Sequence, residues 1–238
     1  MNTQVKQTQS QAGFSLIELL IALTITIIIT GIACNLLAQS MKVRSRANEK
    51  VDAVADAQRA LNMMSRELAN SGFNLDDNGI VAEDSITDET GNSTIRVRAN
   101  LNKFDTTVSS AARANISVVD TDAGEDVKYF LYPAGNTNLL ARFDRFDGSA
   151  GTSTVLANRL DAMHVHYFAQ KVTYSTSDCD ISSPSASEVS VASAKYLVIA
   201  ACVQEAAVGN PGDPGYQPAT NVLLVSDVTL RNWSLSTY

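Results

Sequence analysis

The sequence lacks the motifs of the common enzyme classes. It contains no G-x-S-x-G nucleophile elbow, no phosphate-binding P-loop and no dinucleotide-binding G-x-G-x-x-G. Its only histidines, His164 and His166, are two residues apart on an expected strand and share one of its faces. Because no Cys/His spacing typical of zinc sites accompanies them, we interpret them as solvent-facing strand residues. We therefore expect no catalytic residues, no metal site and no cofactor, and we do not expect an enzyme.

Clusters of basic residues are also missing. The chain has 18 Lys and Arg against 25 Asp and Glu, which gives a net charge of −7. An acidic chain without a concentrated run of Lys and Arg is not typical of a nucleic-acid-binding protein. We therefore do not expect nucleic acid to be a primary ligand.

One long apolar run dominates the N-terminal part of the chain. From Phe14 to Ala38 the only charged residue is Glu18. A helix over residues 14–38 would be ~37 Å long, which exceeds the ~30 Å hydrocarbon core of a bilayer. A carboxylate within such a helix is costly unless an opposite charge pairs with it. Glu18 therefore indicates a specific partner.

The segment GFSLIE, from Gly13 to Glu18, resembles the class III signal of type IV prepilins and type II secretion pseudopilins. The resemblance implies a leader at residues 1–13, which a membrane-embedded prepilin peptidase removes between Gly13 and Phe14. It also implies N-methylation of Phe14, and pairing of Glu18 with the N-terminal amine of a neighbouring subunit during assembly. Opposite charges attract strongly at low dielectric, which agrees with that role.

Three alternatives compete with this interpretation. An ordinary secretory signal has a basic n-region and a shorter apolar core, whereas this leader carries only Lys6. A lipoprotein would use Cys34, and a membrane-anchored periplasmic enzyme would need neither GFSLIE nor Glu18.

The cations after the span, Lys42, Arg44 and Arg46, would place the C-terminal side in the cytoplasm by the positive-inside rule. The prepilin resemblance requires the opposite orientation, and we favour it over the charge count.

After the apolar run the pattern becomes that of an amphipathic helix. Residues 39–72 continue the helix, with an apolar stripe that includes Val51, Val54, Leu61 and Leu68 and passes through Gln58 and Ser65. The glycine at position 72 is a stop signal. The first half of the helix (14–38) is expected to cross the membrane and mediate assembly, and the second half to pack on its own domain.

Residues 73–238 are expected to form an exported, β-rich globular domain. Strands are predicted at 95–99, 115–120, 127–132, 138–144, 163–169, 194–203 and 221–230. Residues 173–193 and 206–220 are rich in Ser, Pro or Gly and are predicted to be irregular surface insertions. The expected fold class is α+β: the pilin fold, in which one long N-terminal helix packs on an antiparallel β-sheet.

Further resemblance points to minor pilins of the PilW type, and next to pseudopilin J of type II secretion. The helix end from Arg66 to Phe73 and the strand patterns of residues 127–142, 160–167 and 228–232 carry it. It implies a subunit that joins a type IV pilus, initiates or caps the fibre, and supports adhesion, twitching motility or DNA uptake. The implied partners are prepilin peptidase, other major and minor pilins, the inner-membrane assembly platform and the lipid bilayer. The implied location is the inner membrane before assembly, as a single-pass protein, and afterwards the pilus or pseudopilus, in the periplasm or at the cell surface. The mid-span proline usual in the family is absent, with Asn35 near its place.

The remaining candidates are a disulfide and two acidic loops. Cys179 and Cys202 lie 23 residues apart in the expected exported domain. In an oxidising compartment they are candidates for a disulfide, worth ~3 kcal/mol, although two separate buried thiols are the alternative. Residues 74–79 and 120–126 carry Asp and Gly in patterns that partly match calcium loops. Such clusters are more often turns, and we interpret them so.

Overall fold

The computed structural model describes residues 15–101, 122–135, 137–212 and 215–232. The chain divides into two compact units, residues 1–48 and 49–238. One helix, α1 (Leu16–Asn70), contributes to both units, and the second unit also contains the β-strands. This confirms the α+β class, with one long N-terminal helix and an antiparallel sheet.

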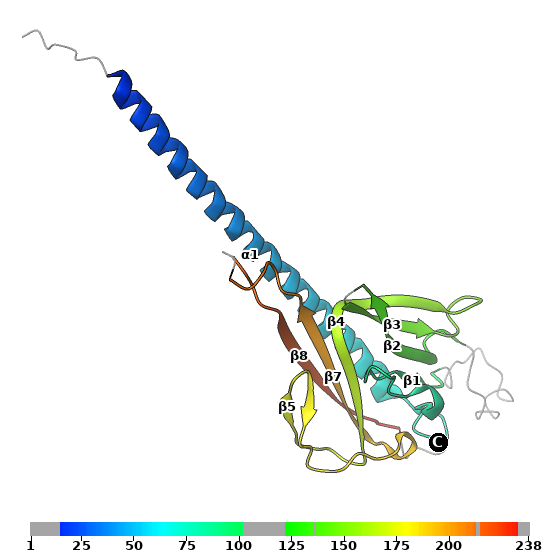
Figure 1. Cartoon of the computed structure of the whole chain (residues 1–238). Helices are drawn as coiled ribbons and strands as arrows, with labels where there is room; N and C mark the ends of the chain where they lie inside the picture. Colours follow the sequence, from blue (N-terminus) through cyan, green and yellow to red (C-terminus); the bar gives the residue numbers. More distant parts are fainter. Residues whose placement is uncertain (1–14, 102–121, 136, 213–214, 233–238) are drawn as a thin grey trace, which may run out of the picture. The chain divides into compact units, whose positions relative to one another are not determined.

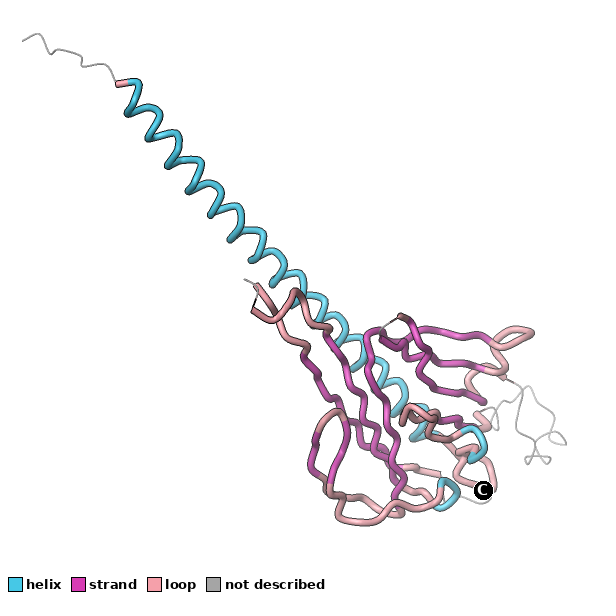
Figure 2. Tube along the Cα trace, in the orientation of Figure 1, coloured by secondary structure: helices cyan, strands magenta, loops and turns pink. Residues whose placement is uncertain are grey.

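Six strands form one antiparallel sheet in the order β1-β2-β3-β4-β7-β8 (Figures 1 and 2). Their bounds are β1 (Ile95–Arg98), β2 (Asp126–Ala134), β3 (Thr137–Asp144), β4 (Thr152–Phe168), β7 (Tyr196–Glu205) and β8 (Thr220–Thr229). A two-stranded hairpin, β5 (Ser175–Ser177) and β6 (Asp180–Ser182), and two 3-10 turns, η1 (Ala82–Asp84) and η2 (Val191–Ser193), complete the domain. Six predicted strands are confirmed, and the one predicted at 115–120 lies outside the described residues.

Strand β4 is much longer than predicted, and a bulge divides it. Its first half pairs with β3 and its second half with β7, and the register shifts on both sides of Leu160. Arg159 adopts the left-handed conformation at φ 58°, which is uncommon for a residue with a side chain. The bulge interrupts the alternation of inward and outward side chains. The alternating pattern therefore reveals only the second half of β4, from Met163 onward.

The main core lies between residues 49–70 of α1 and one face of the sheet. The fully buried helix residues are Ala53, Ala57, Ala60, Leu61, Met64 and Leu68. The stripe is thus rotated from the predicted one: Leu61 and Leu68 are buried, but Val51 is 66% exposed and Gln58 is also exposed. The three alanines explain the difference, because small side chains let the strands approach the helix closely. A pattern search based on large apolar residues does not weight them.

A smaller core covers the opposite face of the sheet. Along β7, Leu197 and Ile199 belong to the main core, whereas Tyr196 and Val198 belong to the second one. Residues 173–190, named the flap here, contribute side chains to this second core; they are Tyr174, Ile181 and Ala186. The prediction of an irregular insertion was therefore wrong in part, since the flap contains the β5–β6 hairpin and packs on the sheet.

Two glycines allow the tight turn after the C-terminal end of α1, and the side-chain amide of Asn232 caps that end. Gly72 and Gly79 have φ 74°, and a Cβ atom at Gly79 would lie 2.1 Å from the backbone nitrogen of Gly72. The amide of Asn232 donates to the carbonyl oxygens of Asn70 and Ser71, at 3.2 and 3.3 Å. Both carbonyls lie at the helix end, where backbone oxygens lack helical partners, and that of Asn70 also accepts from the Phe73 nitrogen at 3.1 Å. Asn232 thus caps the helix, which was predicted to stop near residue 72.

Candidate functional site

The first unit presents an apolar helix whose large side chains are exposed. By length and composition, α1 can cross a membrane. The exposed apolar residues are Leu16, Ile17, Leu19, Leu20, Ile21, Leu23, Ile25, Ile27, Ile28, Ile29, Ile32, Leu36 and Leu37. Every residue from Leu16 to Asn70 is α-helical, including Asn35.

Three threonines interrupt the apolar run, and the helix itself satisfies their hydroxyl groups. Thr24 Oγ1 donates to the carbonyl oxygen of Ile21 at 2.8 Å. Thr26 and Thr30 donate to carbonyls four residues earlier, at 2.7 and 2.8 Å. A hydroxyl bonded in this way exposes no unpaired donor to hydrocarbon. The segment is therefore compatible with an apolar environment despite its polar residues.

Glu18 lies in the first turn of α1 and is exposed. The carbonyl oxygen of Ser15 accepts hydrogen bonds from the backbone nitrogens of Glu18 and Leu19, at 3.0 and 3.1 Å, and so starts the helix. The N-terminal end of a helix carries partial positive charge, which favours a carboxylate there. Gly13 and Phe14, the predicted cleavage and methylation residues, lie outside the described residues.

Residues 8–33 match the family model of the prokaryotic N-terminal methylation motif. The N-terminus is that of a type IV pilin-like or pseudopilin protein. The match includes Gly13, Phe14 and Glu18, and proteins with this motif are structural subunits that associate with membranes, are processed by prepilin peptidase and assemble with other pilins. A search of curated proteins and a search of solved structures each found no significant match.

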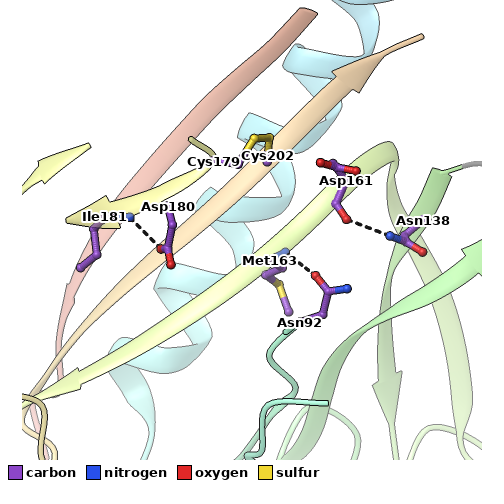
Figure 3. Close-up of a disulfide and its surroundings, with 8 residues drawn as sticks. All are labelled: Asn92, Asn138, Asp161, Met163, Cys179, Asp180, Ile181 and Cys202. Carbon is purple, nitrogen blue, oxygen red and sulfur yellow. Dashed lines mark hydrogen bonds between the residues drawn. A yellow bond between two sulfur atoms is a disulfide. The ribbon is translucent and has the colours of Figure 1, made fainter. Parts of the chain in front are cut away.

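The two predicted cysteines form a disulfide in the second unit. Cys179 of the flap and Cys202 of β7 are bonded, with their Cα atoms 5.1 Å apart (Figure 3). The alternative of two separate thiols is therefore wrong. The carboxylate of Asp161 lies close to both sulfur atoms. Sulfur atoms that are bonded to each other offer no thiolate, so this group is not a metal centre. Cys34 is a free, exposed thiol.

The two histidines lie beneath the flap, which corrects the prediction that they face solvent. The side chains of His164 and His166 are 24% and 16% exposed. His166 lies between two carboxylates: Nε2 is 2.7 Å from Asp180 Oδ1, and Nδ1 is 2.7 Å from Glu188 Oε1. Burial lowers the pKa of His166, but its hydrogen bonds to Glu188 and Asp180 outweigh burial and raise the pKa overall. Sequence reasoning missed these carboxylates because they belong to the flap.

The acidic loops serve as turns in the residues that the structure describes. Asp77 Oδ1 accepts a hydrogen bond from the Gly79 nitrogen at 2.7 Å, and its Oδ2 is 3.5 Å from Arg98. In the second loop, residues 120 and 121 lie outside the described residues. Asp126, at its end, pairs with Arg96 at 2.6 Å. These contacts agree with the turn interpretation of both loops.

Proposed function

We propose that this chain is a minor pilin subunit of a type IV pilus, which prepilin peptidase cleaves between Gly13 and Phe14 and methylates on Phe14. One observation carries the proposal: the methylation motif leads directly into an apolar helix with Glu18 in its first turn. Cleavage creates a new cationic amine at Phe14, and Glu18 is the carboxylate closest to it along the chain. Peptidase processing therefore supplies the charge that pairs with Glu18 of a neighbouring subunit.

Assembly follows from the exposed apolar surface of residues 16–37. Within the bilayer, helices associate through close packing and polar contacts rather than through a hydrophobic driving force. Burial among sister helices keeps Glu18 in surroundings of low dielectric constant, where its attraction to an opposite charge is strong. An unpaired carboxylate there remains costly. Helix packing thus supplies the contact, and the Glu18 pair selects one axial position between neighbours.

The second unit would lie outside the inner membrane, and its disulfide supports this placement. Disulfides form and persist in exported proteins and are rare in the cytosol. Cys179 and Cys202 are bonded, whereas Cys34, in the apolar helix, is free. The precursor would be a single-pass inner-membrane protein. The mature subunit would join major and other minor pilins through the inner-membrane assembly platform, with a role in initiating the fibre that serves adhesion, twitching motility or DNA uptake.

The mature N-terminus tests the proposed class. The protein would be purified from membranes of its own host and its N-terminal peptide analysed by mass spectrometry. The expected peptide begins at Phe14 and carries one added methyl group. A chain that begins at Met1, or one that is lipidated at Cys34, would contradict the proposal.

A second measurement separates a pilus from a secretion pseudopilus. Pili would be sheared from the cells and probed for the protein, with a strain that lacks the major pilin as the control. The proposal expects the mature chain in the sheared fraction of the parent strain only. Its absence from pili, together with a secretion defect in a strain that lacks the protein, would favour the pseudopilin J-like alternative.

A further inference from the structure

The outer face of β4 carries a histidine ring that lies between two carboxylates of the flap. Nε2 of His166 is 2.7 Å from Oδ1 of Asp180, and Nδ1 is 2.7 Å from Oε1 of Glu188. Only 16% of the His166 side chain is exposed, so most of the ring is covered by protein. Each ring nitrogen therefore has a carboxylate oxygen at hydrogen-bond distance.

Two short contacts of this kind require a hydrogen on both ring nitrogens. A neutral imidazole carries one N–H group, so it donates to one carboxylate and presents a lone pair to the other. Two acceptors 2.7 Å apart repel each other. The imidazolium ion donates from both nitrogens and supplies the opposite charge. Because imidazole is ordinarily more basic than a carboxylate, the geometry is that of a protonated His166.

The charges that act on His166 come from the flap. They belong to Asp180 and Glu188. His164, on the same face of β4, has Nδ1 3.9 Å from Oδ2 of Asp180, which is beyond hydrogen-bond distance. The residue opposite His166 on β7 is the apolar Val198. The proton on His166 is thus held by the two flap carboxylates.

Titratable groups farther along the same face keep their charge near neutral pH. Burial raises the pKa of Tyr196 on β7 to about 12, so its hydroxyl stays neutral. Asp227 of β8, which is opposite Val198, accepts a hydrogen bond from the Tyr174 hydroxyl at 2.6 Å. Histidine is the side chain that ordinarily changes charge between pH 5 and 8. A pH effect in this range on the flap therefore points to the histidines beneath it.

The pKa of His166 agrees with this geometry. Burial opposes the charged ring, but the hydrogen bonds to Glu188 and Asp180 outweigh burial and raise the pKa above its usual 6.5. A raised folded-state pKa means that folding favours the protonated ring. Its stabilising effect is complete below about pH 6.5 and is lost as the pH rises through the folded-state pKa.

Both carboxylates lie in the part of the flap that follows the disulfide, residues 180–190, which is named the arm here. Cys179, directly before the arm, is bonded to Cys202 of β7, and the Ile181 nitrogen donates to Asp180 Oδ1 at 2.7 Å (Figure 3). The disulfide holds this end of the arm on the sheet at any pH. Loss of the contacts to His166 therefore opens the arm without detaching the flap.

The arm covers apolar side chains of the sheet. Ile181 and Ala186 of the arm pack on the second core, in which Phe168 of β4 and Val198 of β7 are fully buried. An open arm exposes these side chains to water. Such exposure is unfavourable, so the arm stays closed only while its polar contacts add to this packing.

We propose that His166, Asp180 and Glu188 form a pH-dependent clasp. In mildly acidic solution the protonated ring holds the arm on β4, and in alkaline solution the loss of its proton releases the arm and uncovers apolar residues of β4 and β7. The proton leaves from one ring nitrogen, and the attraction at that nitrogen becomes a repulsion between two acceptors. This inference does not depend on the pilin proposal.

Nuclear magnetic resonance of the full-length chain in detergent, labelled with ¹⁵N-histidine, tests the charge. The chain contains two histidines only, and the spectrum of His164→Gln assigns their signals. At pH 6 both nitrogens of His166 should carry a hydrogen. The ring should lose its proton at a higher pH in the folded chain than in the chain unfolded by urea. A neutral His166 at pH 6 would overturn the proposal.

Hydrogen exchange of the arm, followed by mass spectrometry, tests the opening. Comparing His166→Gln with the wild type at the same pH cancels the intrinsic pH dependence of exchange. At pH 6 the arm amides of the variant should exchange ~10-fold faster or more, the factor that corresponds to one charge-assisted hydrogen bond. At pH 8.5, measured by quenched flow, the two proteins should differ much less. A ratio that is the same at both pH values would contradict the clasp.

Variants of the flap separate the clasp from its surroundings. Asp180→Asn and Glu188→Gln each remove one charged acceptor and should also speed arm exchange at pH 6. Asp178→Asn is the matched control, because it removes a flap carboxylate that does not contact His166. Its left-handed φ of 46° also suits Asn. Arm exchange as fast in Asp178→Asn as in Asp180→Asn would overturn the proposal.

The wild type decides alone if a variant fails to fold, as judged by its circular dichroism. Its arm amides and its β7 amides are compared at pH 6 and pH 8.5, after division by their intrinsic rates. The proposal expects the arm to lose protection by ~10-fold or more relative to β7. Parallel behaviour of the arm and β7 would show that His166 does not control the arm.

Discussion

Glu67 of α1 and Arg142 of β3 form an ion pair, with 3.1 Å between Glu67 Oε1 and Arg142 Nη2. The Tyr129 hydroxyl of β2 donates a hydrogen bond to the other oxygen of the same carboxylate. Burial, followed by the charge of Glu67, raises the pKa of Tyr129, so this hydroxyl stays protonated and remains a donor. One helix carboxylate thus joins α1 to two strands of the sheet.

Replacing Glu67 with Gln should lower the free energy of unfolding by ~1–3 kcal/mol, because a charge-assisted contact among half-buried groups is lost. Asp56→Asn is the control, since Asp56 pairs with Arg59, which is 78% exposed. The control should cost less than ~0.5 kcal/mol. Urea unfolding of the full-length chain in detergent, followed by circular dichroism, measures both. Equal losses would mean that the Glu67 contact does not fasten the helix.

The disulfide leads to two predictions, one for the stability of a variant without it and one for the number of reactive thiols in the unfolded protein. In the double variant Cys179→Ala, Cys202→Ala the free energy of unfolding should fall by ~3 kcal/mol, because the cross-link no longer restricts the unfolded chain. Cys34→Ala should leave the unfolding of the second unit unchanged. The unfolded wild type should show one reactive thiol without reductant and three after reduction. Three thiols before reduction would contradict the pairing.

Sequence patterns predicted the elements of this fold better than their contacts. The apolar run, the glycine stop at residue 72 and the alternating strands located α1 and six strands, because each depends on local periodicity. The first half of β4 was missed because its polar and apolar side chains do not alternate and a bulge interrupts it near Arg159. The hairpin within the flap is too short, at three residues a strand, to produce a recognisable pattern.

The candidate sites divide in the same way. Gly13, Phe14 and Glu18 form a contiguous motif, which a family model also recognises. The residues around His166 are not close together in the sequence. Asp180 and Glu188 come from a segment that folds back over β4 after the strand has ended. Only tertiary structure brings these side chains together, so neither spacing nor composition revealed them.

The rotated helix stripe leads to a test of packing. Ala57 is 1% exposed, whereas Val51, which was predicted to face the core, is 66% exposed. Ala57→Leu inserts methyl and methylene groups into a filled space and should cost ~1–3 kcal/mol. Val51→Leu should stay within ~0.5 kcal/mol of the wild type, as surface substitutions usually do. A larger loss of unfolding free energy for Val51→Leu than for Ala57→Leu would show that the predicted stripe faces the core.

Asp84 should make part of the stability depend on acid pH. Arg96 donates to Asp84 Oδ2 at 2.5 Å and Lys128 to Oδ1 at 3.0 Å. These hydrogen bonds, Arg96 first, hold the pKa of Asp84 below its usual 3.8 although burial opposes them. A lowered pKa in the folded state means that folding favours the ionised form. The resulting stability is complete above about pH 4–5 and is lost as the pH falls through the folded-state pKa.

The Asp84→Asn variant measures this contribution. Its deficit in unfolding free energy relative to the wild type should be largest near neutral pH and should shrink steadily below about pH 4, where the wild-type carboxylate gains its proton. Urea unfolding of both proteins at a series of pH values gives the difference directly. A deficit that does not change with pH would show that the Asp84 charge does not stabilise the fold.

Glu18 provides the last test, because its charge and its helix can be changed separately. Glu18→Ala removes the carboxylate from the first turn of α1 but retains a good helix former. We expect cleavage between Gly13 and Phe14 to continue and incorporation into fibres to be lost, since the new amine of a neighbouring subunit has no partner. Thr24→Ala is the control: it removes a polar group whose hydroxyl bonds only to its own helix, and it should assemble normally. Mass spectrometry of the N-terminus reports cleavage, and immunoblots of sheared fibres and membranes report incorporation. Glu18→Ala subunits that enter fibres at wild-type levels would show that packing of the apolar helix alone drives assembly and that Glu18 has no pairing role.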